Sequence, residues 1–191
     1  LLFATHPHED HIGGLVPVLQ SSINIQDIVY NGYNYTTQIF NTWKTLALTH
    51  NLTIANRNKV FALTPTINFT VNSPTTPHQF SDLNANSLVL RLQVSNTSIM
   101  LTGDATTESE LSSLTSGLTL QSQILKLGHH GSSYSTSQAF LNAVTPTYGV
   151  ISAGIDNSYG HPAQQTLDRL TQNDVSTYGT YKDGTVVFQL N

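Results

Sequence analysis

The sequence contains no cysteine, and this absence excludes two kinds of site. Disulfide bonds cannot form, and no metal ion can be bound by thiolates. Any metal ion must therefore be held by His, Asp or Glu side chains. The eight histidines and eleven acidic residues are the groups available for that purpose.

Charge is scarce as well. Asp, Glu, Lys and Arg make up 9% of the residues, whereas about a quarter is usual. Hydrophobic residues still make up 38% and recur along the chain, so the low charge does not indicate disorder. Only Arg57 and Lys59 form a local basic group, which is no electrostatic footprint for nucleic acid. This weighs against a processive nuclease, unless bound cations add positive charge.

Long apolar runs are missing too. No run reaches the roughly 20 residues that cross a bilayer, and no secretory signal peptide is visible. A cysteine-free chain with little charge and much Asn and Thr is compatible with an extracytoplasmic location. The chain begins with Leu1, inside a predicted buried strand, rather than with Met. We therefore expect it to be the N-terminally truncated part of a longer protein, whose missing segments could attach it to a membrane.

Hydrophobic periodicity predicts strands that alternate with helices. Strands are predicted at residues 1–5, 25–31, 60–63, 67–71, 87–94, 98–101, 124–127, 148–152, 177–181 and 185–190. Helices are predicted at residues 11–20, 36–49, 107–114, 137–144 and 162–172, with Ser137 as a cap. The last two strands would form a hairpin around Asp183-Gly184. With no linker or repeat visible, residues 1–191 are expected to form one layered α/β domain.

The first chemical motif follows the first strand and reads His6-Pro7-His8-Glu9-Asp10-His11. Because His6 and His8 are two residues apart in an extended loop, they can bind one metal ion together. Asp10 and His11 open a helix, where they can hold a second ion. The simpler alternative is an Asp that caps the helix beside exposed histidines. Three histidines and an aspartate within six residues favour the metal site, and such ligands suit Zn, Mn or Fe.

Three later motifs also follow predicted strands. Asp104 comes after Gly103 at a strand end, where a carboxylate can bridge two cations, although Gly-Asp alone is more typical of a plain turn. His129 and His130 lie between glycines and could contact a phosphate, donate a proton or bind a metal, or else belong to a merely polar loop. His161 lies at the start of a helix, a position that alone indicates no function. We interpret the remaining histidines, His50 and His78, as ordinary surface residues.

Together these segments resemble a known family. The motif from His6 to His11, followed by Ile12-Gly13-Gly14, is similar to the signature of metallo-β-lactamase-fold hydrolases. The later segments resemble the hydrolase domain of ComEC-type competence proteins and related stand-alone hydrolases, including phosphorylcholine esterases. These segments are Asn86-Ser87-Leu88-Val89-Leu90-Arg91-Leu92, Leu101-Thr102-Gly103-Asp104-Ala105, Leu125-Lys126-Leu127-Gly128-His129-His130-Gly131-Ser132 and Tyr159-Gly160-His161-Pro162.

The resemblance implies an α/β/β/α sandwich with a centre of one or two divalent metal ions, Zn or Mn being favoured. His6 and His8 would hold one ion, and Asp10, His11 and His161 the other, with Asp104 bridging. The implied reaction is hydrolysis of a phosphodiester, with Asp10, His129 and His130 as catalytic residues. For a ComEC-type parent the substrate would be single-stranded DNA during uptake. No protein partner is indicated.

Two departures from the family pattern affect these expectations. A metal-binding His often precedes the bridging Asp, but here that region holds Asn84, Asn86 and Ser87. The ion at His6 and His8 would then be weakly held, or completed by Asn86 or water. The family's opening strand pair is also absent, so part of one sheet is expected to be missing. Hydrolysis of a lactone, thioester or other non-phosphate ester, and a non-catalytic binding module, are the alternative functions.

Overall fold

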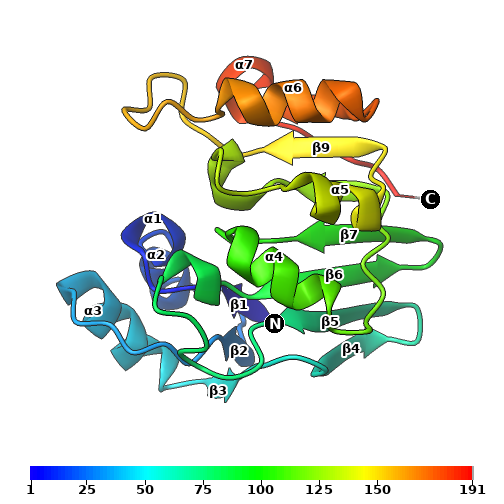
Figure 1. Ribbon diagram of the computed structural model, residues 1–191. Coiled ribbons are helices and arrows are strands. Elements are labelled where there is room, and N and C mark those ends of the chain that lie inside the picture. The colour runs from blue at the N-terminus through cyan, green and yellow to red at the C-terminus, as the bar shows by residue number, and fades with distance from the viewer. Residues whose placement is uncertain (191) are drawn as a thin grey trace.

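The computed structural model describes residues 1–190, which form two β-sheets flanked by helices (Figure 1). The strands are β1 (Leu2–Ala4), β2 (Asp27–Tyr30), β3 (Asn51–Ile54), β4 (Val60–Thr64), β5 (Ile67–Ser73), β6 (Val89–Val94), β7 (Thr97–Leu101), β8 (Ile124–Lys126), β9 (Tyr148–Ile151) and β10 (Ser176–Gly179). The helices are α1 (Glu9–Ile12), α2 (Leu15–Gln20), α3 (Gln38–Ala47), α4 (Thr107–Leu114), α5 (Gln138–Val144), α6 (Gln164–Gln172) and α7 (Thr180–Asp183). Two short 3-10 turns are η1 (Asn84–Asn86) and η2 (Gly128–Gly131).

The two sheets differ in size and in strand direction. The small sheet has the order β1-β2-β3, and all its pairs are parallel. The large sheet has the order β10-β9-β8-β7-β6-β5-β4. Its pairs are parallel from β10 to β7 and antiparallel from β7 to β4. The carboxyl ends of β7 and β9 point to the edge where α1 and α2 lie (Figure 1).

Alternating side chains build the layers, because successive strand residues face opposite sides of a sheet. In β2, Ile28 and Tyr30 pack with Phe40 and Trp43 of α3, whereas Val29 packs toward the large sheet with Leu90. A separate hydrophobic core lies between the outer face of the large sheet and helices α5 and α6. It includes Leu125 of β8, Phe140 of α5 and Leu170 of α6. The result is the α/β sandwich that the sequence predicted.

The predicted C-terminal hairpin is wrong. The chain leaves β10 and turns into α7, where the Asp183 carboxylate accepts a hydrogen bond from the Gly179 N–H at 2.8 Å. Residues 185–190 are not a strand. This segment contacts the sheet through a side chain: the Phe188 ring packs on those of Tyr148 and Tyr178, with ring centroids 5.5 and 6.2 Å apart.

Two further boundaries differ from the prediction. The single helix expected over residues 11–20 begins earlier and is split into α1 and α2 at Gly13 and Gly14, since glycine weakens a helix interior. Strand β3 was not predicted, because its sequence Asn51-Leu52-Thr53-Ile54 is short and has little periodicity. It pairs with β2 along its full length. Within residues 1–190, no helix combines the length and hydropathy that crossing a membrane requires.

Candidate metal centre

The first motif wraps around the end of β1. His6 is completely buried, and its ring centroid lies 4.1 Å from that of His11. His8 precedes α1, and the side chains of Asp10 and His11 project from the first turn of that helix. The Asp10 side chain remains 63% exposed, whereas that of His11 is 15% exposed. One residue of the motif thus anchors it in the protein, and another reaches into solvent.

Asp104 is delivered by the end of β7. Gly103 precedes it with φ +52, and a Cβ there would lie 3.0 Å from the Cβ atoms of both Ser87 and Thr5. Only glycine therefore lets β7 end so close to β1. The Asp104 side chain is almost fully buried, and its backbone N–H donates to the Ser87 Oγ at 3.1 Å.

The two adjacent histidines lie on η2, directly after β8. His129 and His130 have left-handed φ angles of 46° and 55°. This conformation costs a non-glycine residue about 1–2 kcal/mol, and such strain is concentrated at functional sites. His130 Nδ1 donates to the Ser152 carbonyl at 2.7 Å, which leaves Nε2 facing the centre of the site.

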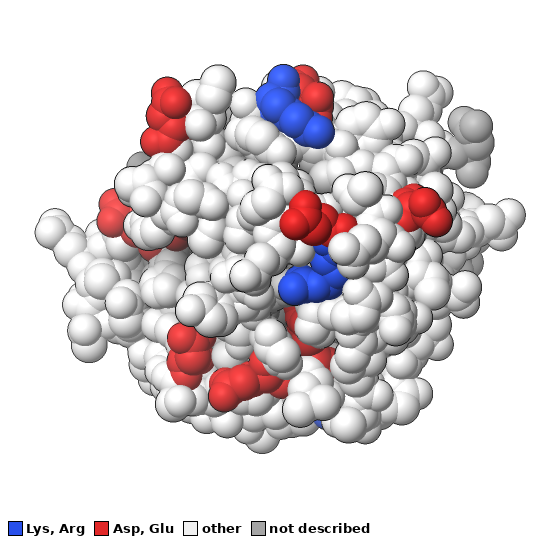
Figure 2. Space-filling view, turned by 45° about the horizontal axis from the view of Figure 1, so that its top comes forward, with Lys and Arg blue, Asp and Glu red and all other residues white. Residues whose placement is uncertain are grey.

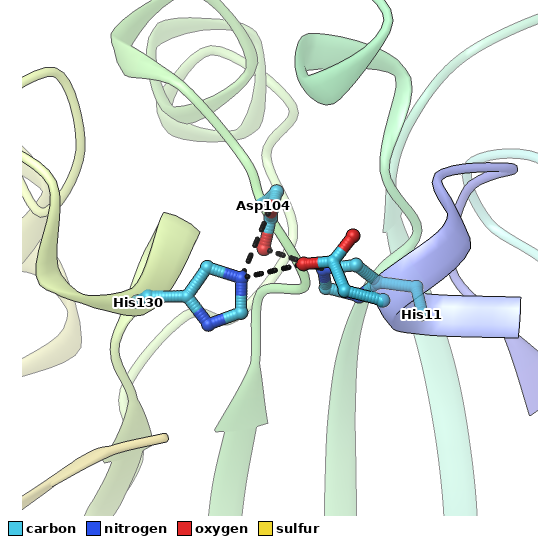
Figure 3. Close-up of side chains that lie close together, drawn as sticks. His11, Asp104 and His130 are labelled. Carbon is cyan, nitrogen blue, oxygen red and sulfur yellow. Dashed lines mark ion pairs between the residues drawn. The ribbon is translucent and has the colours of Figure 1, made fainter. Parts of the chain in front are cut away.

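Four of these side chains converge from both sheets, and we name Asp10, His11, Asp104 and His130 the carboxylate cluster. One ligand atom from each lies within 4.8 Å of the others. The His11 Nε2 is 3.2 Å from Asp104 Oδ1 and 3.4 Å from Asp10 Oδ2. The His130 Nε2 is 3.3 Å from Asp10 Oδ2 and 3.5 Å from Asp104 Oδ2. Figure 3 shows His11 and His130 approaching Asp104 from opposite sides.

Charge couples the members of the cluster. The nearby carboxylates of Asp10 and Asp104 raise the pKa of His130 to about 10. Burial alone would lower the pKa of His11, but the same two carboxylates outweigh it and hold that pKa above its ordinary value. The imidazoles in turn keep the pKa of each carboxyl group far below normal, against the burial of Asp104. Both carboxylates are therefore ionised, and their negative charge favours a cation between them.

The donor set fits a divalent metal ion. His11 Nε2, Asp104 Oδ1 and His130 Nε2 are buried, close together and without a partner in hydrogen-bond geometry. Leaving such atoms unsatisfied costs about 1–3 kcal/mol each, so the arrangement needs another occupant. Two imidazoles and two carboxylates are ligands that suit Zn or Mn.

The other proposed half-site, which we name the histidine pair, consists of His6 and His8. Their Nε2 and Nδ1 atoms are 3.1 Å apart, and His6 Nε2 lies 3.9 Å from Asp104 Oδ2. His6 Nδ1 contacts the Ser87 hydroxyl at 3.1 Å, which orients the ring. Burial and the neighbouring His11 lower the pKa of His6 to about 3, so this imidazole is neutral.

Asn86 does not complete the histidine pair. Its amide oxygen accepts from the Phe80 N–H at 3.1 Å. Its amide nitrogen donates to the carbonyls of Phe80 and Asp82 at 2.8 and 2.6 Å. Of the three possibilities for this half-site, a weakly held ion or one completed by Asn86 or by water, the structure argues against Asn86, because its side chain is used to fold the loop before β6.

His161 lies beside the carboxylate cluster but is not a member of it. Its ring centroid is 5.4 Å from that of His129. The loop is tied to η2: the Ala163 N–H donates to the Gly131 carbonyl at 2.9 Å. Gly131 has φ +83, and a Cβ there would lie 2.7 Å from Pro162 Cβ. The two loops that carry histidines from the large sheet are thus packed directly on each other.

A cavity of about 580 Å³ opens above these groups. Its lining residues are His8, Glu9, Asp10, Asn84, Asp104, His129, His130, Tyr159 and His161. Sequence reasoning gave no role to Glu9 or Tyr159, although each stands within two residues of a proposed ligand. His50 and His78 do not line it: His50 Nδ1 bonds the Ile25 carbonyl at 2.8 Å, and the His78 ring packs on Tyr33.

Comparison with known proteins identifies the family of this chain. Residues 1–155 match the model of the metallo-beta-lactamase superfamily, and the chain belongs to that superfamily. Within it, the chain is similar to competence proteins of the ComEC type. It is 40% identical over 110 residues to Competence protein ComA of Neisseria gonorrhoeae and 35% identical over 123 residues to ComE operon protein 3 of Bacillus subtilis.

A third relative is aligned over more of the chain. Recombination protein 2 of Haemophilus influenzae is 28% identical over 186 residues, or 97% of the chain. The alignments with ComA and ComE operon protein 3 cover 57% and 64% of the chain. In each case the matched region is a small part of the relative, from 16% to 21% of its length.

Proposed function

We propose that this domain is a metal-dependent phosphodiesterase that cleaves single-stranded DNA during uptake. The observation that carries the proposal is the carboxylate cluster, which gathers two carboxylates and two imidazoles beneath an open cavity. The names of two relatives, Competence protein ComA and Recombination protein 2, support the link to DNA.

The proposed ligands follow from the geometry. Asp10, His11, Asp104 and His130 would hold one Zn or Mn ion, and His161, which lines the same cavity, is a further candidate ligand. His6 and His8 hold a second ion, with Asp104 between the two sites. When bound, these ions lower the pKa of a water molecule and neutralise charge on the phosphate.

The remaining steps belong to the chain's own residues. Asp10 is exposed at the cavity, where its ionised carboxylate can accept a hydrogen bond from the attacking water and orient it. Hydrolysis forms a bond from that water oxygen to phosphorus and breaks the bond from phosphorus to the leaving oxygen, which takes up a proton. Of the two adjacent histidines, His129 is the freer to hydrogen-bond the leaving oxygen, because His130 is engaged with two carboxylates. Burial lowers the pKa of His129, so it acts as a neutral N–H donor and the proton comes from solvent. His129 Nδ1 is without a hydrogen-bond partner, and the residue lines the cavity.

The experiment is hydrolysis of bis(p-nitrophenyl) phosphate, single-stranded DNA and a panel of lactones and thioesters by protein loaded with Zn or Mn. Turnover of the two phosphodiesters alone supports the proposal. Turnover of lactones or thioesters alone would contradict the phosphodiesterase proposal and favour hydrolysis of a non-phosphate ester. Bound metal without turnover of any substrate would favour a binding module that retains the fold.

We further propose that the domain belongs to a longer, membrane-attached protein and acts outside the cytoplasm. The small fraction of each relative that the chain matches supports the greater length, and the low charge and lack of cysteine are compatible with a place outside the cytoplasm. Membrane helices encoded in the same gene, with the domain accessible to protease on the outer face of intact spheroplasts, are the expected result. Protection of the domain from that protease would contradict it.

A further inference from the structure

Tyr159 is an aromatic side chain at the mouth of the cavity with nothing to cover it. It is 82% exposed, although it lines the same cavity as Asp104 and His129. Its ring is stacked on that of His161, with centroids 6.0 Å apart and planes 19° from parallel. Exposing so large a side chain gains nothing for the fold, and its position beside the proposed ligands points to a role in binding.

The loop under Tyr159 is fixed rather than loose. The Asn157 amide nitrogen donates to the carbonyls of Gly154 and His161, at 2.9 and 2.6 Å. Its amide oxygen accepts from the His161 N–H at 2.9 Å. One side chain thus closes the turn that carries Tyr159, so the ring is held in place before a ligand arrives. Such preorganisation reduces the entropy lost on binding.

Lys and Arg side chains are not placed to bind a ligand at this cavity. Among residues 1–190, no Lys or Arg lines the cavity, and basic side chains are sparse and scattered on the face drawn in Figure 2. Arg57, Arg91 and Arg169 each donate to backbone carbonyls of their own fold. Beyond the phosphate at the metal centre, a nucleic-acid strand therefore meets no matching cation at this site. An exposed aromatic ring such as that of Tyr159 can instead contact its bases.

We propose that Tyr159 is a stacking platform for the nucleobase next to the scissile phosphate. This rests on the proposed function and makes single-stranded DNA, rather than a small phosphodiester, the preferred ligand. Stacking on an aromatic side chain tolerates any base, because every base has a flat π face. It requires an unpaired strand, because bases in a duplex are already stacked.

The test compares strands with and without bases. Binding of a fluorescein-labelled oligothymidylate to Zn-loaded protein is measured by stopped-flow anisotropy before hydrolysis, beside a strand whose central nucleotides are abasic tetrahydrofuran units. Tyr159→Ala should weaken binding of the oligothymidylate by about tenfold, and Tyr159→Phe should restore it. On the abasic strand, the wild type and Tyr159→Ala should bind equally.

Tyr134 provides the matched control. It is 75% exposed but lies in a separate groove beside Ser81 and Thr107. Tyr134→Ala should leave both affinities unchanged. Equal binding of both strands by the wild type, or an equal loss on both strands in Tyr159→Ala, would overturn the stacking platform. Because the readout is binding, that failure is distinct from failure of the hydrolase proposal, which shows as no turnover of bis(p-nitrophenyl) phosphate.

Discussion

The two proposed halves of the metal centre are built differently. The carboxylate cluster draws its side chains from α1, from the end of β7 and from η2, so it spans both sheets. The histidine pair comes from three consecutive residues after β1. The cluster contains two ionised carboxylates, whereas the pair has only imidazoles and a more distant oxygen of Asp104, 3.9 Å away.

This difference shows that ligands close together in the sequence need not form the site that binds a metal ion more tightly. The motif from His6 to His11 supplies residues to both halves, but its first two histidines contact each other, and His6 also contacts Ser87. Negative charge reaches the centre through Asp10 and Asp104, which lie far apart in the chain. We therefore expect the carboxylate cluster to bind its ion tightly and the histidine pair to bind weakly.

The largest effect is expected from Asp104→Asn, which removes the charge shared by the two halves. The amide keeps the volume of this buried side chain, so the fold should be retained. Hydrolysis of bis(p-nitrophenyl) phosphate should fall to background, and metal content by plasma mass spectrometry should drop. A variant with unchanged turnover and circular dichroism would show that neither half depends on Asp104.

The contrast between the halves can be measured with His11→Ala and His8→Ala. His11→Ala should weaken the tighter ion by more than about 100-fold, because loss of an outer-shell partner alone costs 10- to 100-fold. His8→Ala should leave that affinity unchanged and abolish only the weaker binding event. Isothermal titration with Zn separates the two events. If His8→Ala proves the more damaging to tight binding, the ranking of the two halves is reversed.

A smaller effect is expected at Ser87. Its hydroxyl contacts His6 Nδ1 at 3.1 Å and accepts from the Asp104 N–H at 3.1 Å, so it positions one residue of each half. Ser87→Ala should reduce metal affinity or activity by about 10- to 100-fold. Ser98→Ala is the matched control, since Ser98 is equally buried but bonds Gln123 in the large sheet. Equal affinities in both variants would remove the positioning role.

The pH dependence of metal binding sharpens the comparison further. In the metal-free protein the pKa of His130 is about 10, so this imidazole carries a proton at pH 7 that a metal ion must displace. Affinity of the carboxylate cluster should therefore rise with pH, by about tenfold per pH unit for each proton released. The pKa of His6 is about 3, so His6 has no proton to release at pH 7. Titrations in buffers of different ionisation enthalpy count the protons, and tight binding without proton release would contradict this account.

Much of the fold could be predicted because periodicity and capping are local. Helix α4 has the predicted limits, and Ser137 caps α5 by accepting from the Phe140 N–H. Strand β3 was missed because its order comes from pairing with β2. The false hairpin arose from Asp183-Gly184, a typical hairpin turn whose aspartate instead bonds back to Gly179.

The site was harder to predict than the fold. The sequence indicated which side chains bear chemistry, but not their distances from one another. The family resemblance placed His161 with Asp10 and His11, a grouping that stays a prediction, and neither it nor the sequence indicated that His130 lies within reach of both carboxylates. That depends on the left-handed backbone of η2 and on the bond from His130 to Ser152, neither of which leaves a pattern in the sequence.

The contact between Gly131 and Pro162 has a consequence for how such a centre can be altered. The loops that carry His130 and His161 meet with no room for even one added methyl group. A change in the shape of either loop must therefore be matched in the other. In engineering or in evolution the two segments form a single transferable unit, and grafting one of them alone into a related domain should yield a protein that folds less well than either parent.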